Sequence, residues 1–198
     1  MENINFKQNK LFIEKISVEK LCKDYGTPLY VYSKKNLIEA FNRINDNLKK
    51  LDRLLCFSIK TCSNINIIKI LKEQGAGCDI VSGGELYRAL KAKVAPEKIV
   101  YAGVGKTAEE IEYALKSKIL MFNCESIPEI ELINKIAGKL KTTARIAIRV
   151  NPDVDAHTHS KITTGKKENK FGISIDIVAD LYKNIKKKMK NIEIYGVH

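Results

Sequence analysis

Short apolar runs alternate with amphipathic helical patterns along this chain, with a repeat of roughly 20 to 25 residues. This alternation predicts parallel strands, because one parallel strand can follow another only after a crossover, usually a helix. The predicted strands are residues 28–33, 54–59, 78–81, 99–102, 119–123, 143–150 and 192–197. The predicted helices are residues 17–24, 34–49, 65–73, 84–91, 108–116, 127–137 and 175–187. We therefore expect an α/β protein.

Two α/β architectures fit this order of elements, an open doubly wound sheet and a (β/α)8 barrel. The even repeat favours the barrel. A doubly wound nucleotide-binding sheet would also carry a glycine-rich turn after its first strand, and none follows Ile59. Polar residues near the strand ends fit a barrel as well: Asp79, Ser82, Asn123, Arg149 and Asn151. From residue 54 we count about six strands, so we expect an incomplete (β/α)8 TIM barrel with six of its eight strands.

The run 103–107, Gly-Val-Gly-Lys-Thr, imitates the end of a P-loop. A P-loop requires another glycine five residues before its second glycine. Val100 occupies that position, inside a predicted strand. We therefore reject a nucleoside-triphosphate site at this run.

The formal net charge of +12 raises the question of nucleic-acid binding. Most of the excess is lysine at helix-surface spacing, including the run 186–188, and no aromatic residues interleave with it. Arginine, the usual reader of bases and phosphates, is confined to Arg43, Arg53, Arg88, Arg145 and Arg149. We interpret the lysines as a solvated face and expect no nucleic-acid partner.

The cysteines and the apolar runs bear on localisation. The five cysteines form no C-x-x-C pair, and several lie in predicted strands, which is typical of reduced thiols in a cytoplasmic protein. No apolar run approaches the roughly 18 residues of a membrane span. The residues after Met1 do not form a secretory leader. We expect a cytoplasmic protein without a membrane partner.

Lys60 is the strongest candidate for a reactive residue. It directly follows the predicted strand 54–59, and Asn64 then offers an N-cap for the next helix. A lysine shielded from water at such a strand end can lose its proton and form a Schiff base. The structural alternative is a lysine whose side chain extends from the strand end to the surface.

Several motifs in order resemble the diaminopimelate decarboxylases, pyridoxal-phosphate enzymes of the alanine-racemase-like fold. The motifs are residues 25–32 (YGTPLYVY), 57–60 (FSIK), 77–86 (GCDIVSGGEL), 149–152 (RVNP), 157–159 (HTH), 164–165 (TG), 170–172 (KFG) and 195–198 (YGVH). Each motif alone is weak, whereas the ordered set spans nearly the whole chain. Thr61, Cys62 and Ser58 depart from the residues usual around the family lysine, although they are small residues in the same turn.

The resemblance implies a function and a set of site residues. Lys60 would hold pyridoxal 5'-phosphate as a Schiff base, with Asp79, Arg149 and His198 close to the cofactor. The expected activity is decarboxylation of the amino acid meso-2,6-diaminopimelate to L-lysine by a homodimer. From its position alone, Asp79 could instead cap a helix or form a structural hydrogen bond at the strand end, and Arg149 could instead be a surface ion-pair partner. The alternative functions are decarboxylation of ornithine, arginine or carboxynorspermidine, and a non-catalytic pyridoxal-phosphate carrier.

The resemblance also implies a domain organisation. Residues 1–33 would contribute a strand to a β domain, and residues 34–198 would form a partial pyridoxal-phosphate barrel. The phosphate loop, the glutamate for the pyridine nitrogen, the substrate-carboxylate arginine and the proton-donating cysteine would lie beyond residue 198. We therefore expect a truncated chain that does not decarboxylate alone.

The insertion between the strand 143–150 and the helix 175–187 contains His157 and His159, with Asp153 and Asp155 nearby. Alternating ligands without a third fixed partner are weak signs of a metal, so we expect none. We interpret the insertion as a loop over the mouth of the active site. The run 170–172 would anchor its return.

Overall fold

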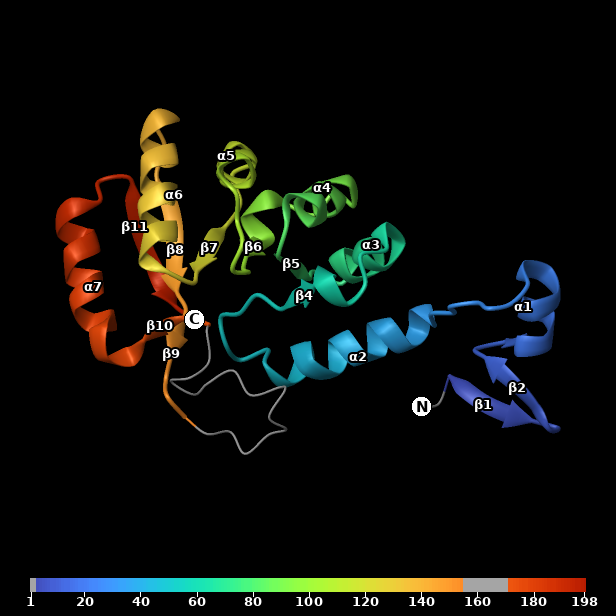
Figure 1. The fold of residues 1–198 in the computed structure, drawn as a ribbon. Coiled ribbons are helices and arrows are strands. Elements are labelled where there is room, and N and C mark those ends of the chain that lie inside the picture. The colour runs from blue at the N-terminus through green and yellow to red at the C-terminus, as the bar shows by residue number, and fades with distance from the viewer. Residues whose placement is uncertain (1–2, 155–170) are drawn as a thin grey trace.

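The structure is a computed structural model that describes residues 3–154 and 171–198. Its centre is a parallel six-stranded sheet in the order β11-β8-β7-β6-β5-β4 (Figure 1). The strands are β4 (Cys56–Ser58), β5 (Gly77–Ile80), β6 (Ile99–Tyr101), β7 (Met121–Cys124), β8 (Ala144–Ile148) and β11 (Ile192–Val197). The helices are α2 (Lys34–Asn47), α3 (Ile65–Glu73), α4 (Gly83–Lys91), α5 (Ala108–Lys116), α6 (Ile127–Lys139) and α7 (Ile175–Lys188).

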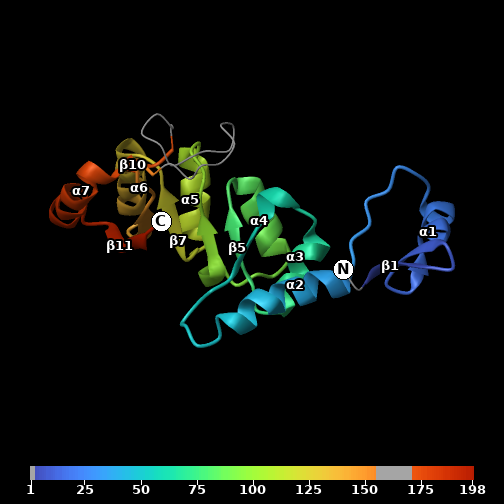
Figure 2. The same cartoon turned by 90° about the horizontal axis from the view of Figure 1, so that it is seen from below.

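The strand order identifies the architecture. Within this sheet each strand pairs with the next sheet strand along the chain, whereas a doubly wound sheet reverses direction at a switch point. The helices fan out along the outer side of the curved sheet in Figures 1 and 2. This arrangement confirms the prediction of a partial barrel with six strands.

The main hydrophobic core lies between the sheet and these helices. Ile80 and Ile146 of the sheet and Leu86 and Ile133 of the helices are all fully buried in one cluster. Each such side chain contributes about 1.5–3 kcal/mol to folding relative to an exposed one. The outer helices are therefore held to the sheet by apolar packing.

Capping side chains fix where the helices begin. The hydroxyls of Ser82, Thr107 and Ser126 accept backbone N–H groups of α4, α5 and α6, and Asn64 does the same for α3. Loss of such a cap costs about 1 kcal/mol. Because the helices follow the strands, these caps also set the geometry of the loops at the carboxyl end of the sheet.

The predicted strand 143–150 is split at Arg149. β8 ends at Ile148, and β9 (Val150–Asn151) pairs in parallel with β10 (Ile173–Ser174). The Arg149 N–H donates to Cys124 O at 2.9 Å, whereas the Val150 N–H donates to His198 O at 2.8 Å on the other side. At this residue the backbone hydrogen bonds change from a partner at the end of β7 to a partner at the end of β11.

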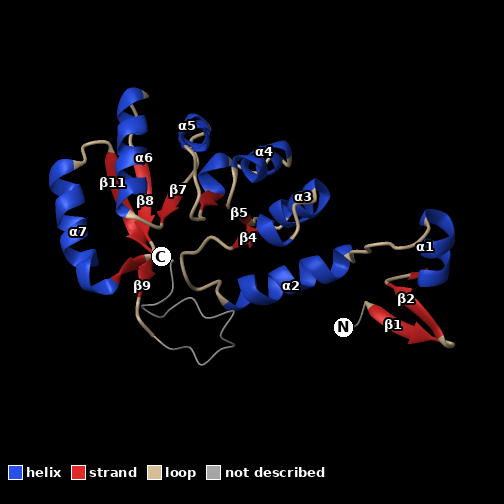
Figure 3. Ribbon diagram, in the orientation of Figure 1, coloured by secondary structure: helices blue, strands red, loops and turns tan. Residues whose placement is uncertain are grey.

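Residues 3–25 form a separate small unit, whose helix the sequence patterns predict and whose strands they do not. It contains β1 (Ile4–Lys7), β2 (Lys10–Ile13) and β3 (Ile16–Ser17), which form an antiparallel sheet, and the predicted helix α1 (Val18–Tyr25) (Figure 3). Gln8 and Asn9 both have positive φ, 49° and 62°, between β1 and β2. Two such residues suit the tight turns of two-residue hairpins.

The predicted strand 28–33 is wrong, because this segment has no strand partner among the described residues. Its β-branched and aromatic residues favour extended backbone, but a strand also needs a neighbouring edge. Tyr30 is 89% exposed and Tyr32 is 51% exposed. The segment leads as an extended linker from α1 to α2.

Polar contacts connect the N-terminal unit to the start of α2. The Asn3 Nδ2 group donates to Asn36 Oδ1 and to Glu39 Oε2, each at 2.7 Å. The Ser33 hydroxyl donates to Glu14 Oε1 at 2.7 Å. This junction depends on hydrogen bonds, in contrast to the apolar packing of the barrel helices.

The five cysteines, all within the described residues, are free thiols. Within residues 3–154 and 171–198, no helix has both the length and the apolar character needed to cross a bilayer.

Candidate active site

A cavity of about 550 Å³ lies at the carboxyl end of the parallel strands. Lys60, Asp79, Arg149 and His198 all line it, and they come from the ends of four different strands, β4, β5, β8 and β11. The carboxyl end is where barrel enzymes carry their active sites. The structure thus brings the four predicted site residues together in one cavity.

Lys60 lies in a short 3₁₀ turn, η1 (Ile59–Thr61), directly after β4. Within this turn Ile59 is fully buried, whereas Lys60 is exposed. The prediction that Lys60 is shielded from water is therefore wrong for this structure. The reason is that β4 is the edge strand of the described sheet, so the wall of the cavity beside Lys60 is open. The side chain still lines the cavity.

Asp79 lies on β5, and the Ser58 hydroxyl of the neighbouring β4 donates to its Oδ2 at 2.9 Å. The helix-cap alternative for Asp79 is wrong, because Ser82 is the N-cap of α4. Burial and the nearby Asp79 carboxylate raise the pKa of the Cys56 thiol to about 11. Burial, then Cys56 and Asp79, raise the pKa of Cys78 to about 12. These thiols stay protonated beside the carboxylate at neutral pH.

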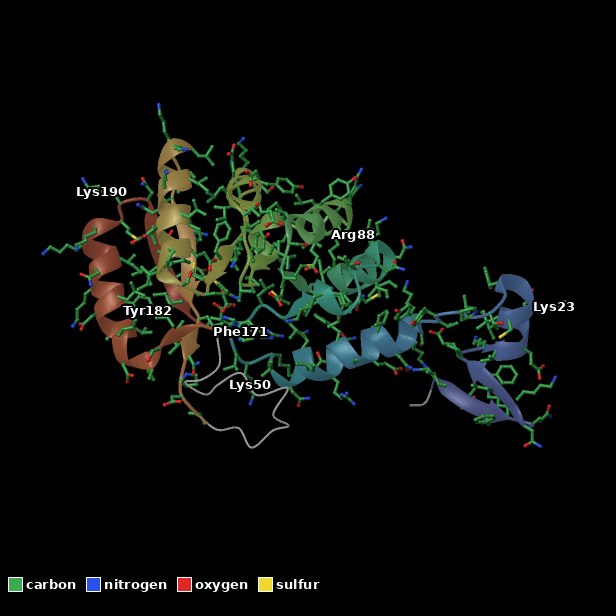
Figure 4. The ribbon with its side chains drawn as sticks, viewed as in Figure 1. Lys23, Lys50, Arg88, Phe171, Tyr182 and Lys190 are labelled. Carbon is green, nitrogen blue, oxygen red and sulfur yellow. The ribbon has the colours of Figure 1, made fainter. Side chains whose placement is uncertain are left out.

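Arg149 lies between β8 and β9, with 29% of its side chain exposed. Its Nη1 donates to Glu125 Oε1 at 2.8 Å, and Glu125 is only 5% exposed. The guanidinium also lies 5.2 Å from the centre of the Phe171 ring, within the range of a cation–π contact. Figure 4 places Phe171 toward the inner side of the curved sheet. Arg149 therefore forms an ion pair, as the alternative to a cofactor role predicted. The pair is not on the surface, however, because Glu125 is buried and both residues line the cavity.

Glu125 is a site residue that sequence reasoning missed. It directly follows β7, and the rule that pointed to Asp79 and Asn123, a polar group at a strand end, also applies to it. Lys106 and Glu129 were missed as well; they form an ion pair of 2.7 Å with side-chain exposures of 1% and 10%. Because these partners are 23 residues apart in the chain, no spacing rule connects them.

His198 lies at the end of β11, and its N–H donates to Ile148 O at 2.9 Å. Burial and the positive charge of Arg149 lower the pKa of its imidazole, while Glu125 and Asp79 act in the opposite direction. The imidazole is therefore neutral over a wider pH range than that of a free histidine.

Asn123 on β7 contributes an unusual polar atom. The residue is 5% exposed and lines the cavity, yet its Oδ1 has no hydrogen-bond partner among the described residues. A buried acceptor of this kind is costly unless a ligand supplies a donor. It indicates a cavity built to receive a polar molecule.

The insertion is described only in part. His157, His159, Asp155, residues 164–165 and Lys170 lie outside the described residues. Phe171 and Gly172 are described, and the Gly172 N–H donates to Glu125 Oε2 at 3.2 Å. Residues 3–154 and 171–198 contain no group of three or more His, Cys, Asp or Glu side chains that could hold a metal ion.

Comparisons with known proteins support the sequence motifs. Residues 34–198 match the model of the pyridoxal-binding domain of the pyridoxal-dependent decarboxylases. The diaminopimelate decarboxylase of Aquifex aeolicus is 49% identical over 98% of this chain and 46% of its own length. The enzyme of that name from Haemophilus influenzae is 45% identical over 100% of this chain and 47% of its own length.

Solved structures give the same result. The crystal structure of diaminopimelate decarboxylase from M. jannaschii, in complex with L-lysine, matches with a TM-score of 0.91 and 36% identity, over 100% of this chain and 47% of that one. The chain spans about half the length of the relatives it matches. The resemblance to the diaminopimelate decarboxylases is thus confirmed, and the chain belongs to the pyridoxal-dependent decarboxylases through their pyridoxal-binding domain.

Proposed function

We propose that the protein containing these residues is a pyridoxal-phosphate-dependent decarboxylase that converts meso-2,6-diaminopimelate to L-lysine. The observation that carries the proposal is the convergence of Lys60, Asp79, Arg149 and His198 on one cavity at the carboxyl end of the sheet. The substrate is supported by relatives of 40–49% identity that bear the name diaminopimelate decarboxylase. The L-lysine in the M. jannaschii complex is the expected product.

The cavity suits pyridoxal phosphate. Its volume of about 550 Å³ lies within the usual range for small-molecule sites. Lys60 supplies a primary amine for an aldehyde, and Arg149 supplies a positive charge for an anionic ligand. The unpaired Oδ1 of Asn123 offers an acceptor to a ligand donor. We assign Lys60, Asp79, Arg149 and His198 to the cofactor site, with Lys60 as the catalytic amine.

When bound, the cofactor supplies an electron sink for the electron pair left by departing carbon dioxide. The residues of the chain determine what surrounds it. Asp79, held by the Ser58 hydroxyl at 2.9 Å, places a carboxylate next to β4, the strand that leads into the turn with Lys60. Arg149 places a positive charge in the same cavity, three strands away from Asp79 in the order of the sheet. Its pairing with Glu125 limits the motion of the guanidinium.

His198 contributes an uncharged imidazole to the lining of the cavity. Burial and the Arg149 charge lower its pKa, so the imidazole is neutral at physiological pH. We therefore assign His198 to the cofactor site as a neutral side chain; in the motif that the chain resembles, the histidine that stacks on the cofactor ring would come two residues later.

The remaining parts of the proposal concern organisation. We propose that residues 1–33 belong to a β domain, which the antiparallel strands β1–β3 and the exposed Tyr30 and Tyr32 support. Residues 34–198 form the cofactor-binding barrel unit, in line with the family match over the same range. We also propose a cytoplasmic homodimer; the five free cysteines support the reducing compartment.

The test uses the full-length protein that contains this sequence. It is incubated with pyridoxal phosphate, reduced with borohydride and digested, and the labelled peptide is identified by mass spectrometry. We expect the label on Lys60, and we expect none in Lys60→Ala. Lys69, an exposed lysine on α3, gives the matched control variant Lys69→Ala, which should label like the wild type.

Carbon dioxide release is then measured with diaminopimelate, ornithine, arginine and carboxynorspermidine. Release from diaminopimelate at a rate far above the others is the expected result. A label on another lysine would refute the assignment of Lys60. Faster release from ornithine or arginine would refute the substrate while leaving the cofactor site intact.

A further inference from the structure

A buried ion pair, Lys106–Glu129, lies next to the cavity residue Glu125, and the proposed function gives this pair no role. Lys106 is the lysine of the run that imitates a P-loop. The Lys106 Nζ donates to Gly103 O at 2.7 Å and to Asn123 O at 2.9 Å, and it pairs with Glu129 at 2.7 Å. The lysine therefore connects the loop after β6 to the end of β7.

Glu129 extends these contacts to the cavity wall. Its second oxygen, Oε2, accepts the Glu125 N–H at 2.8 Å. The backbone of Glu125 is thus fixed by a glutamate that is itself held by a buried lysine. With its backbone fixed in this way, Glu125 presents its carboxylate at a defined place beside the cavity.

Both carboxylate oxygens of Glu125 are used. Oε1 accepts from Arg149 Nη1 at 2.8 Å, and Oε2 accepts the Gly172 N–H at 3.2 Å. Because the side chain is 5% exposed, water cannot readily replace either donor. One buried carboxylate therefore joins the strand-end arginine to the segment that leads into β10.

The close approach of this segment to Arg149 depends on glycine. Gly172 has a φ of +79°, and a Cβ added there would lie 2.9 Å from Arg149 O. The Ile173 N–H also donates to Arg149 O at 2.8 Å, and the Phe171 ring lies 5.2 Å from the guanidinium. Phe171, Gly172 and Ile173 therefore all contact Arg149, whose guanidinium is paired with Glu125.

We propose that Glu125 is a positioning residue, which orients the Arg149 guanidinium toward the anionic cofactor and fixes the segment 171–174 against it. The Lys106–Glu129 pair holds Glu125 in place. The part of this inference that concerns the cofactor rests on the proposed function. The part that concerns Gly172 does not.

The test compares Glu125→Gln, Arg149→Met and the double variant in the full-length protein. Glu193→Gln is the matched control, because Glu193 pairs with Arg145 at the other end of β8. The first measurement is the dissociation constant for pyridoxal phosphate, from its absorbance change. The second is hydrogen exchange of the Gly172 and Ile173 amides in the cofactor-free protein.

We expect Glu125→Gln to weaken cofactor binding roughly tenfold to hundredfold, the loss associated with a charged hydrogen bond. The double variant should bind no more weakly than Arg149→Met, because Glu125 acts through Arg149. Exchange at Gly172 should become at least about tenfold faster in Glu125→Gln and stay unchanged in Glu193→Gln.

Unchanged Gly172 exchange in Glu125→Gln would overturn the inference, as would losses in cofactor binding that add in the double variant. If the wild type does not bind the cofactor at all, the proposed function fails, and the exchange measurement still decides the role of Glu125. If Glu125→Gln does not fold, Glu125→Asp replaces it. That variant keeps the charge but is one methylene shorter, so it should also release Gly172, and wild-type exchange in it would overturn the inference.

Discussion

Strand β8 has an arginine–glutamate pair at each end, and the two pairs differ mainly in burial. At the amino end, Arg145 pairs with Glu193 at 3.1 Å, with side-chain exposures of 47% and 50%. At the carboxyl end, Arg149 pairs with Glu125 at 2.8 Å, with exposures of 29% and 5%. Each arginine also lies over an aromatic ring, Tyr195 for Arg145 and Phe171 for Arg149.

The same contacts therefore have different consequences. An exposed pair contributes about 0–1 kcal/mol, because water solvates either charge when the partner is lost. A buried glutamate has no such replacement, so removal of its partner is far more costly. The amino end of the sheet can lose its charges, whereas the carboxyl end depends on them. Four predictions test this difference, from the largest expected effect to the smallest.

The largest effect is expected at Lys106, the most deeply buried charge of the carboxyl end among the ion pairs described above. Lys106→Met leaves Glu129, which is 10% exposed, without its cation. We expect a loss of about 3–5 kcal/mol in the free energy of unfolding, measured by urea denaturation. Lys116→Met, which breaks an exposed pair with Glu112, should cost less than about 0.5 kcal/mol. Equal losses in the two variants would contradict the comparison.

The amino end of the parallel sheet should instead be sensitive to changes in side-chain packing. Gly77 begins β5, and a Cβ there would meet Lys98 O and lie 2.9 Å from Cys56 Sγ. Gly77→Ala should lower the free energy of unfolding by about 3 kcal/mol, because the backbone must shift. A Cβ added at Gly105 would meet no described atom within 4 Å, so Gly105→Ala is the control. A tolerated Gly77→Ala would show that the amino end can adjust.

The two arginines of β8 give the most direct comparison. Arg149→Met should cost about 2 kcal/mol in thermal or urea unfolding, since Glu125 loses a charged hydrogen bond while it stays buried. Arg145→Met should cost less than about 1 kcal/mol, because Glu193 remains solvated. If the order of the two losses were reversed, burial would not be the property that distinguishes the pairs.

The smallest effect is the change in the stability of the fold at acidic pH, which depends on Glu110. Burial acts to raise the pKa of Glu110, but hydrogen bonds from the N–H groups of Gly83 and Thr107, together with the Tyr101 and Thr107 side chains, lower the pKa below 4.5. A carboxylate with a lowered pKa stabilises the fold above its unfolded pKa and loses that contribution as the pH falls through its folded pKa. Glu110→Gln should therefore be less stable than the wild type at pH 7, and the difference should shrink below pH 4.5.

Urea unfolding at pH 7 and at acidic pH measures this change. Glu131→Gln, on the exposed side of α6, is the control and should show no comparable trend. A difference in stability between wild type and Glu110→Gln that is independent of pH would contradict the assignment of a lowered pKa to the hydrogen-bonded Glu110 carboxylate.

The sequence predicts the barrel well, because its elements obey local rules. The helix predicted for residues 108–116 is observed as α5 with the same bounds, since Thr107 and Glu110 form a capping box that fixes its start. Lys60, Asp79, Arg149 and His198 meet in one cavity because the ends of parallel strands lie together.

The misses share a physical cause, which is that they depend on partners distant in the chain. The segment 28–33 has strand-like residues but no neighbouring edge among the described residues. Strands β1 and β2 have only four residues each, which is too short for a clear periodic pattern. The pairing of Lys106 with Glu129 and of Glu125 with Arg149 follows from the barrel geometry. The openness beside Lys60 follows from the edge position of β4.

The unpaired oxygen of Asn123 has a consequence for discrimination among small molecules. A compound that fills the cavity without donating a hydrogen bond to this oxygen leaves it buried and without a partner. That defect weakens binding by about 1–3 kcal/mol, or roughly fivefold to 150-fold. The Asn123 amide therefore selects against purely apolar ligands at the binding step, before any chemical reaction.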